Sequence, residues 1–183
     1  IKVWDVATGA CLQTLQGHSS TVRSVCVSAD GSRLYSGSYD NTIKVWDVAT
    51  GACLQTLQGH AHWVLSVCVS ADGSRLFSGS QDNTIKVWDV ATGLCVQTLQ
   101  GHALPVPSVC TSPDESRLFS GSDDRTIKVW DVATGACVQT LEGHTNWVES
   151  VCVSADGSRL FSGSLDNTIK VWDVATGACV QTL

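Results

Sequence analysis

Histidine, serine, aspartate and tryptophan recur together along the chain, first as His18, Ser36, Asp40 and Trp46. Serine, histidine and aspartate form a hydrolase triad when the histidine takes the serine proton and the aspartate orients the imidazole ring. Here, however, the set occurs four times where an enzyme needs one site, and no Gly-x-Ser-x-Gly nucleophile elbow accompanies it. We therefore expect a structural role for these residues and no enzymatic activity. The other three sets are His60, Ser78, Asp82 and Trp88; His102, Ser120, Asp124 and Trp130; and His144, Ser162, Asp166 and Trp172.

The sets recur because the whole sequence repeats with a period of 42 residues. The segment Thr-Ile-Lys-Val-Trp-Asp-Val-Ala-Thr-Gly stands unchanged at residues 42–51, 84–93, 126–135 and 168–177. A fixed period of this length is the signature of a repeat architecture in which each unit is one supersecondary structure.

Each unit is predicted to contain four short strands, which in the first unit are residues 22–28, 33–38, 42–48 and 53–58. These segments are rich in β-branched residues, and turn residues such as Asp30-Gly31 separate them. No segment has a helical hydrophobic period. Four antiparallel strands per unit, repeated around an axis, predict an all-β fold built from propeller blades.

The sequence resembles the WD40 family, because each Gly-His pair is followed 28 residues later by Trp-Asp. The resemblance implies a β-propeller in which strands a to d of each blade run outward from a central channel. It also implies a hydrogen-bonded tetrad that joins the d–a loop, through strand b, to the tryptophan of strand c. Ser36 is the expected hydroxyl, although Ser38 points to the same face. The implied blades are residues 16–57, 58–99, 100–141 and 142–183, with strands c and d of a partial blade in residues 1–15.

A ring of five closed blades would need 27 more residues than the chain has. We therefore expect this chain to be an internal stretch of a larger propeller of about seven or more blades, as the family resemblance implies. The near-identical copies also resemble the WD40 arrays of fungal NLR-like incompatibility proteins and of cyanobacteria and algae. In such receptors the repeats form the sensing end.

The amino-acid composition argues against some classes of partner. The net charge is −6, from 17 acidic and 11 basic residues, which argues against a nucleic-acid partner or an anionic membrane. No apolar stretch approaches the ~18 residues of a spanning helix, and no signal peptide is visible, so we expect no membrane insertion and an intracellular, cytoplasmic protein. We expect no cofactor, since neither CxxC nor EF-hand spacing occurs.

The nine cysteines follow the repeat, with gaps that alternate between 15 and 27 residues. Each lies in an apolar run, where a free thiol behaves as a small buried hydrophobe. We expect reduced, buried, structural thiols; disulfide bridges or a zinc site are the alternatives.

The four copies differ in chemistry at few positions. Of the 42 positions, 29 are the same in all four copies, and only five carry three or four residue types. Four of these five lie in the d–a loop and at the start of strand a, and the fifth lies in the b–c turn. In a propeller, these segments emerge on the same face near the channel.

This pattern predicts a scaffold whose top face is diversified to bind a protein or peptide. Trp63 and Trp147 have no counterpart in the other blades, so the fold does not require them, and exposed tryptophan is a frequent interface hot spot. The alternatives are a structural subunit that contacts a large assembly through blade edges, the sensing end of an NLR-like receptor, or tryptophans that cap the core between blades beneath a tolerant loop. The predicted partner-binding residues are Trp63, Trp147, Arg23, Tyr39, His62, Leu65, Gln81, Leu104, Asp123, Asn146, Glu149 and Leu165.

Overall fold

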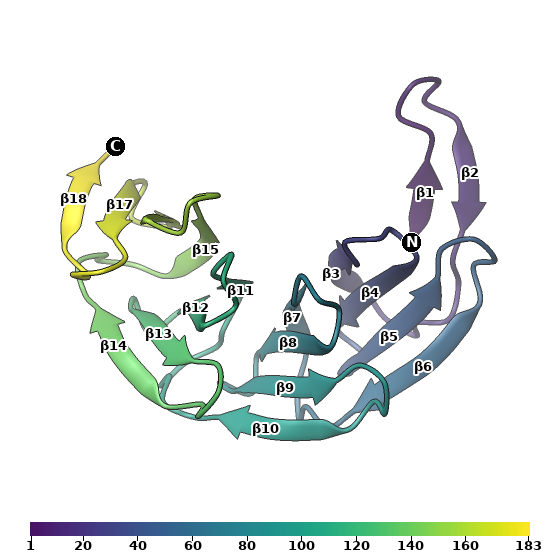
Figure 1. Ribbon diagram of the computed structural model, residues 1–183, viewed down its shortest axis with the longest axis horizontal. Helices are drawn as coiled ribbons and strands as arrows, with labels where there is room; N and C mark the ends of the chain where they lie inside the picture. The colour runs from purple at the N-terminus through teal and green to yellow at the C-terminus, as the bar shows by residue number, and fades with distance from the viewer.

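The computed structural model describes residues 1–183 and consists of β-strands joined by turns and loops. Four antiparallel sheets have four strands each, and a fifth sheet has two strands. The all-β prediction is therefore confirmed. The sheets follow one another along an open arc, with the β1–β2 hairpin at one end and β18 with the C-terminus at the other (Figure 1). The chain forms no helix with the length and apolarity needed to cross a bilayer.

The first complete blade contains β3 (Val22–Val27), β4 (Arg33–Ser38), β5 (Thr42–Asp47) and β6 (Cys53–Gln58), hydrogen-bonded in that order. These bounds agree with the predicted strands to within one residue. Between β3 and β4 the chain reverses at Gly31, whose φ of 71° lies in the left-handed region that favours glycine.

The other blades repeat this pattern. Blade 2 holds β7 (Val64–Val69), β8 (Arg75–Ser80), β9 (Ile85–Asp89) and β10 (Cys95–Leu99); blade 3 holds β11 (Ser108–Thr111), β12 (Arg117–Gly121), β13 (Ile127–Asp131) and β14 (Cys137–Leu141); blade 4 holds β15 (Val148–Val153), β16 (Arg159–Ser164), β17 (Ile169–Asp173) and β18 (Cys179–Thr182). The two-stranded sheet pairs β1 (Lys2–Trp4) with β2 (Cys11–Thr14).

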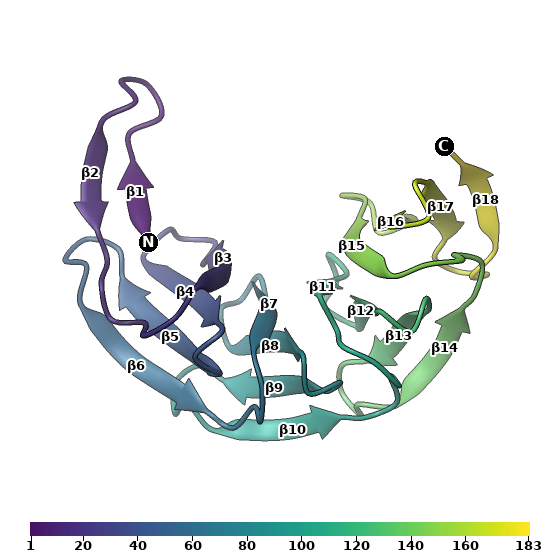
Figure 2. The ribbon, with the colours of Figure 1, turned by 180° about the vertical axis from the view of Figure 1, so that it is seen from behind.

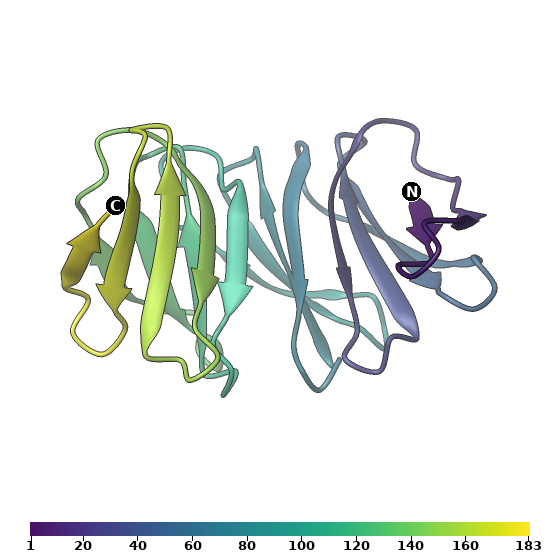
Figure 3. The ribbon, with the colours of Figure 1, turned by 90° about the horizontal axis from the view of Figure 1, so that it is seen from above.

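The innermost strand of every blade lies on the concave side of the arc, and the outermost strand lies on the convex side (Figures 1 and 2). Seen from above, the sheets stand next to one another and their connections leave on two opposite surfaces (Figure 3). The d–a loop and the b–c turn meet on one surface, where the Tyr39 N–H donates to the Thr21 carbonyl. We call this the top surface. The a–b and c–d turns meet on the bottom surface, where the Val48 N–H donates to the Ser32 carbonyl.

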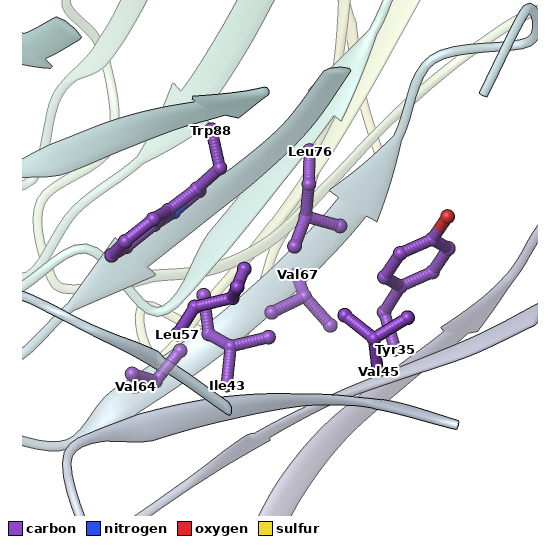
Figure 4. Packing of buried hydrophobic residues seen from close by; sticks show 8 residues of the cluster. All are labelled: Tyr35, Ile43, Val45, Leu57, Val64, Val67, Leu76 and Trp88. Atoms are coloured by element: carbon purple, nitrogen blue, oxygen red, sulfur yellow. The ribbon is translucent and has the colours of Figure 1, made fainter. Parts of the chain in front are cut away.

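Adjacent blades are held together by apolar side chains from both sheets. Between blades 1 and 2, Figure 4 shows Tyr35, Ile43, Val45, Leu57, Val64, Val67, Leu76 and Trp88 packed in one buried cluster. Gly37 makes this approach possible, because a Cβ added there would lie 2.7 Å from Cγ1 of Val64. Equivalent clusters join blade 2 to blade 3 and blade 3 to blade 4. Burying each large aliphatic side chain stabilises the fold by about 1.5–3 kcal/mol.

Strand a contains an irregularity at its second residue. In blade 2, Val64 pairs with Ser80 but Ser66 pairs with Gly79, so Leu65 is a bulge residue without a partner in the ladder. In blade 3, strand β11 begins only at Ser108. Pro107 occupies the bulge position there, where the absent N–H removes no ladder hydrogen bond.

The prediction that all cysteines are buried is wrong for most of them. All nine are free thiols, but the five on the outermost strands are exposed, and so is Cys152. The outermost strand has a neighbour on one side only, so Cys53 faces solvent and its Sγ lies 3.4 Å from the Gln55 carbonyl oxygen. Only Cys26, Cys68 and Cys110 on the inner strands are partly buried. Burial raises the pKa of Cys26 to about 12, so this thiol stays protonated and unreactive.

Candidate functional site

The recurring histidine, serine, aspartate and tryptophan form one continuous hydrogen-bonded network in each complete blade. In blade 2, Nδ1 of His60 lies 2.8 Å from Oδ2 of Asp82, and Nε2 lies 2.7 Å from Oγ of Ser78. The indole Nε1 of Trp88 donates to the same Ser78 oxygen over 2.8 Å. The hydroxyl of Ser80 instead accepts the Asp82 N–H, so the first serine of strand b is the network member in this blade. Blades 1, 3 and 4 have the same three contacts.

These networks cannot act as nucleophilic triads. Ser78 is fully buried, and its single hydroxyl is shared by His60 and Trp88, so it cannot reach an ester or amide carbonyl. Burial raises the pKa of Asp40, but hydrogen bonds from Thr42, His18 and the Ser19 N–H outweigh this effect and lower the pKa to about 2. The carboxylate therefore stays ionised and ties the d–a loop to the b–c turn.

On the top surface, a backbone hydrogen bond joins the d–a loop to the b–c turn in each blade. The Gln81 N–H donates to the Trp63 carbonyl over 2.9 Å, and the Leu165 N–H donates to the Trp147 carbonyl over the same distance. The side chain of Asn146 adds a bond from Nδ2 to the Leu165 carbonyl. The two segments with the most divergent residues are therefore joined directly within each blade.

The divergent side chains also meet across the interfaces between blades. Tyr39 of blade 1 stacks on Trp63 of blade 2, with ring centroids 4.3 Å apart, and His62 packs edge-on against the same indole. Between blades 3 and 4, burial and then the nearby Glu149 carboxylate raise the pKa of Asp123. By the 42-residue repeat, the divergent positions equivalent to these are one of the preceding blade and two of the following blade at each interface. The three sets are Tyr39, Trp63 and Leu65; Gln81, Pro105 and Pro107; and Asp123, Trp147 and Glu149.

The predicted partner-binding residues differ in exposure. Trp63 and Trp147 are 39% and 46% exposed, so neither indole lies in the core between the sheets. Leu65, the bulge residue of β7, is buried, so its assignment as a partner-binding residue of the exposed top face is wrong. The other exposed members are Arg23, His62, Leu104, Asn146 and Leu165, and the partly buried members are Tyr39, Gln81, Asp123 and Glu149.

Two features of the interfaces were not predicted. The Val109 N–H donates to the hydroxyl of Ser66 on the preceding blade, and a serine at this position repeats the bond at the other interfaces. Glu115 replaces the glycine of its a–b turn and adopts a φ of 60°. Its carboxylate reaches blade 2 and accepts the Ala71 and Asp72 N–H groups. The only sequence signal for this contact was the loss of glycine.

Comparison with known proteins gives short matches to long chains. The vegetative incompatibility protein HET-E-1 of Podospora anserina is 60% identical over 43 residues, which are 24% of this chain and 3% of that protein. The nuclear distribution protein PAC1-2 of Uncinocarpus reesii is 50% identical over 42 residues, 23% of this chain and 9% of that protein. The pre-mRNA-splicing factor PRP46 of Eremothecium gossypii is 53% identical over 36 residues, 20% of this chain and 8% of that protein.

Each of these matches is about as long as one repeat and covers less than a tenth of the relative's length. Because the relatives carry three different functional names, the shared feature is the repeat and not a common activity. The family model described as "WD domain, G-beta repeat" matches residues 9–47, 51–89, 93–131 and 135–173, which together are most of the sequence. The chain therefore belongs to the WD40 repeat family.

Proposed function

We propose that this WD40 array is a non-catalytic scaffold that binds a protein or peptide on its top surface. WD40 repeat domains in general are protein-interaction scaffolds and are typically not catalytic. The observation that carries the proposal is the convergence of divergent side chains at the interfaces between blades. Tyr39 and Trp63 are in contact there, and three of the five most variable positions of the repeat are the equivalent positions at each interface, although the buried residues beneath them hardly change.

The exposed tryptophans are the proposed anchors of this surface. Trp63 and Trp147 occupy the position of Thr21 in blade 1 and of Pro105 in blade 3, so the backbone accepts quite different side chains there. Truncating a well-placed interface tryptophan commonly costs ≥2 kcal/mol of binding free energy. The neighbouring Tyr39 and His62 hold the Trp63 ring in one orientation, which reduces the entropy lost on binding.

A random dodecapeptide display library selected on the whole chain tests the proposal. Selected peptides are synthesised and their dissociation constants are measured against Trp63→Thr and Trp147→Thr, which introduce the residue that blade 1 already has. The matched control is Leu94→Ala on the bottom surface, where an exposed leucine replaces the alanine of the other blades. At least one tryptophan variant should weaken binding about 30-fold or more, whereas the control should leave binding unchanged.

The same variants separate binding from folding. Trp147→Thr should keep the melting temperature within a degree or two of the parent chain, because its indole lies outside the core, whereas Trp63→Thr also loses the stack with Tyr39 and should lower it by about 2–4 °C. Peptides that bind all three variants equally, or no selected peptide at all, would contradict the top-surface proposal.

A second candidate function is that of a structural subunit that contacts a large assembly through its blade edges. It is favoured by a row of exposed aliphatic side chains on the outermost strands, where Leu54, Val96 and Val138 are 46%, 58% and 49% exposed. In that case Leu54→Thr and Val96→Thr should abolish assembly, and the tryptophan variants should not affect it. We further propose, from the near-identical copies, that the array is the sensing end of a longer NLR-like receptor; the intact mass of the native protein tests whether the array belongs to a longer chain.

A further inference from the structure

At the interface between blades 3 and 4, the two acidic side chains Asp123 and Glu149 form no ion pair within the chain. The ion pairs of the protein join histidine to aspartate inside the tetrads and arginine to aspartate on the bottom surface. None of them includes Asp123 or Glu149. Burial and the nearby Glu149 and Asp124 carboxylates raise the pKa of Asp123, because each of these effects disfavours its charged form. Arg125 instead lines a neighbouring cleft with Glu142 and forms no ion pair with Asp123.

The exposed indole of Trp147 belongs to the same interface, where the Val148 N–H donates to the Ser122 carbonyl over 3.0 Å and so brings the chain around Trp147 and Glu149 next to the chain around Asp123. Asp123 and Trp147 hold the same repeat positions as Tyr39 and Trp63, whose rings stack across the preceding interface. By this equivalence, the Asp123 carboxylate holds the position beside Trp147 that the Tyr39 ring holds beside Trp63. Trp147 is accordingly the more exposed of the two indoles, 46% against 39%.

We infer that this interface binds an arginine or lysine side chain of the protein segment that the top surface recognises. The inference rests on the proposed function and names the chemistry of its partner. The cationic group lies between the Asp123 and Glu149 carboxylates, where it removes their mutual repulsion, and packs against the face of the Trp147 indole. The net charge of −6 adds a long-range attraction for a basic segment.

The other two interfaces provide controls within the same molecule. Neither the set of Tyr39, Trp63 and Leu65 nor the set of Gln81, Pro105 and Pro107 includes a charged side chain. The variants Asp123→Gln and Glu149→Leu therefore introduce residues that blade 2 already has at these positions. They remove both charges, and the equivalent backbone positions in blade 2 already carry these side chains.

The peptides selected on the whole chain for the top-surface experiment serve as the probes. Those that depend on Trp147 should contain more arginine or lysine than the input library. The double variant Asp123→Gln, Glu149→Leu should bind them at least tenfold more weakly, and replacing the basic residue of the peptide by glutamine should cause a similar loss. The two losses should not add, because both changes remove the same contact. Parallel peptides with arginine or lysine show which cation is preferred.

The outcomes distinguish the two proposals. Peptides that lose affinity with Trp147→Thr but are insensitive to the charge variants and to glutamine in the peptide would overturn the basic-residue inference and leave the top-surface proposal intact. Losses that add independently would also overturn the inference. Selection that gives no top-surface binder would overturn both.

Discussion

The phenol ring of Tyr39 lies nearly parallel to the indole of Trp63, at an angle of 13°, although the two residues belong to different blades. The stack belongs to the same interface as a buried apolar cluster in which Ile43 and Val64 are completely buried. Aromatic pairs of this kind contribute about 0.5–1.5 kcal/mol beyond the area that they bury. The contact therefore stabilises the blade interface and also positions an exposed indole.

Replacing Tyr39 by leucine, the residue of blade 4 at this position, should lower the free energy of unfolding by about 1 kcal/mol. Urea denaturation measures the effect, and Tyr39→Phe is the control, because it retains the stacked ring. A leucine variant as stable as the parent chain would show that the stack contributes nothing to the interface.

Replacing Ser78 by alanine should destabilise the protein by about 3 kcal/mol. The substitution leaves Nε2 of His60 and Nε1 of Trp88 without their shared partner in a buried site. Ser20→Ala, in an exposed part of the d–a loop, should change the free energy of unfolding by less than about 0.5 kcal/mol. Similar stability of the two variants in urea would contradict the structural role of the network.

Stability should fall in acid. Hydrogen bonds from Ser28 and Ser32 lower the pKa of Asp30 to about 2, and the tetrad carboxylate of Asp40 reaches about 2 despite its burial. Because the pKa values are lower in the folded chain than in the unfolded chain, the stabilisation is complete above about pH 4 and disappears as the pH falls through about 2. The urea midpoint should therefore be nearly constant from pH 7 to pH 5 and decline steeply below about pH 4. Asp40→Asn should make this decline shallower, and an unchanged slope would exclude Asp40 as a contributor.

Replacing Glu115 by alanine should lower the free energy of unfolding by about 1 kcal/mol, because the Ala71 and Asp72 N–H groups lose their acceptor while the strained φ of 60° remains. Glu115→Gly removes the same carboxylate but relieves the strain, so it should be the more stable of the two variants. Differential scanning calorimetry gives the order, and the reverse order would show that the turn is not strained.

The regular parts of the fold could be predicted because each local signal is repeated. The strands in blade 1 agree with the prediction because β-branched residues end at turn residues in every copy, as at Asp30 in blade 1. The comparison of copies also found Trp63 and Trp147, since an interior position would not accept both threonine and tryptophan. The structure adds which side chains face each other across an interface.

The errors arise where burial depends on neighbours outside the repeat unit. The Leu65 position carries four residue types and the Trp63 position three, yet Leu65 is buried at a bulge that no local pattern reveals. Cys53 lies in an apolar run, yet its strand is the outermost one and has no second sheet to cover it. The reach of Glu115 to blade 2 depends on the distance between two turns that are distant in the sequence.

The contact of Gly37 with Val64 recurs between Gly79 and Val106 and between Gly121 and Val148. Each interface therefore pairs a glycine on strand b of one blade with a valine at or just before the start of strand a of the next blade. Because this contact is the same at each interface, the blades are interchangeable in their packing. Each set of divergent residues comes from two adjacent blades, one residue from the first blade and two from the second. A change in the order of the blades would therefore create new sets without any point mutation. Under the proposed function, reshuffling the blades of such an array would change which side chains meet on its top surface.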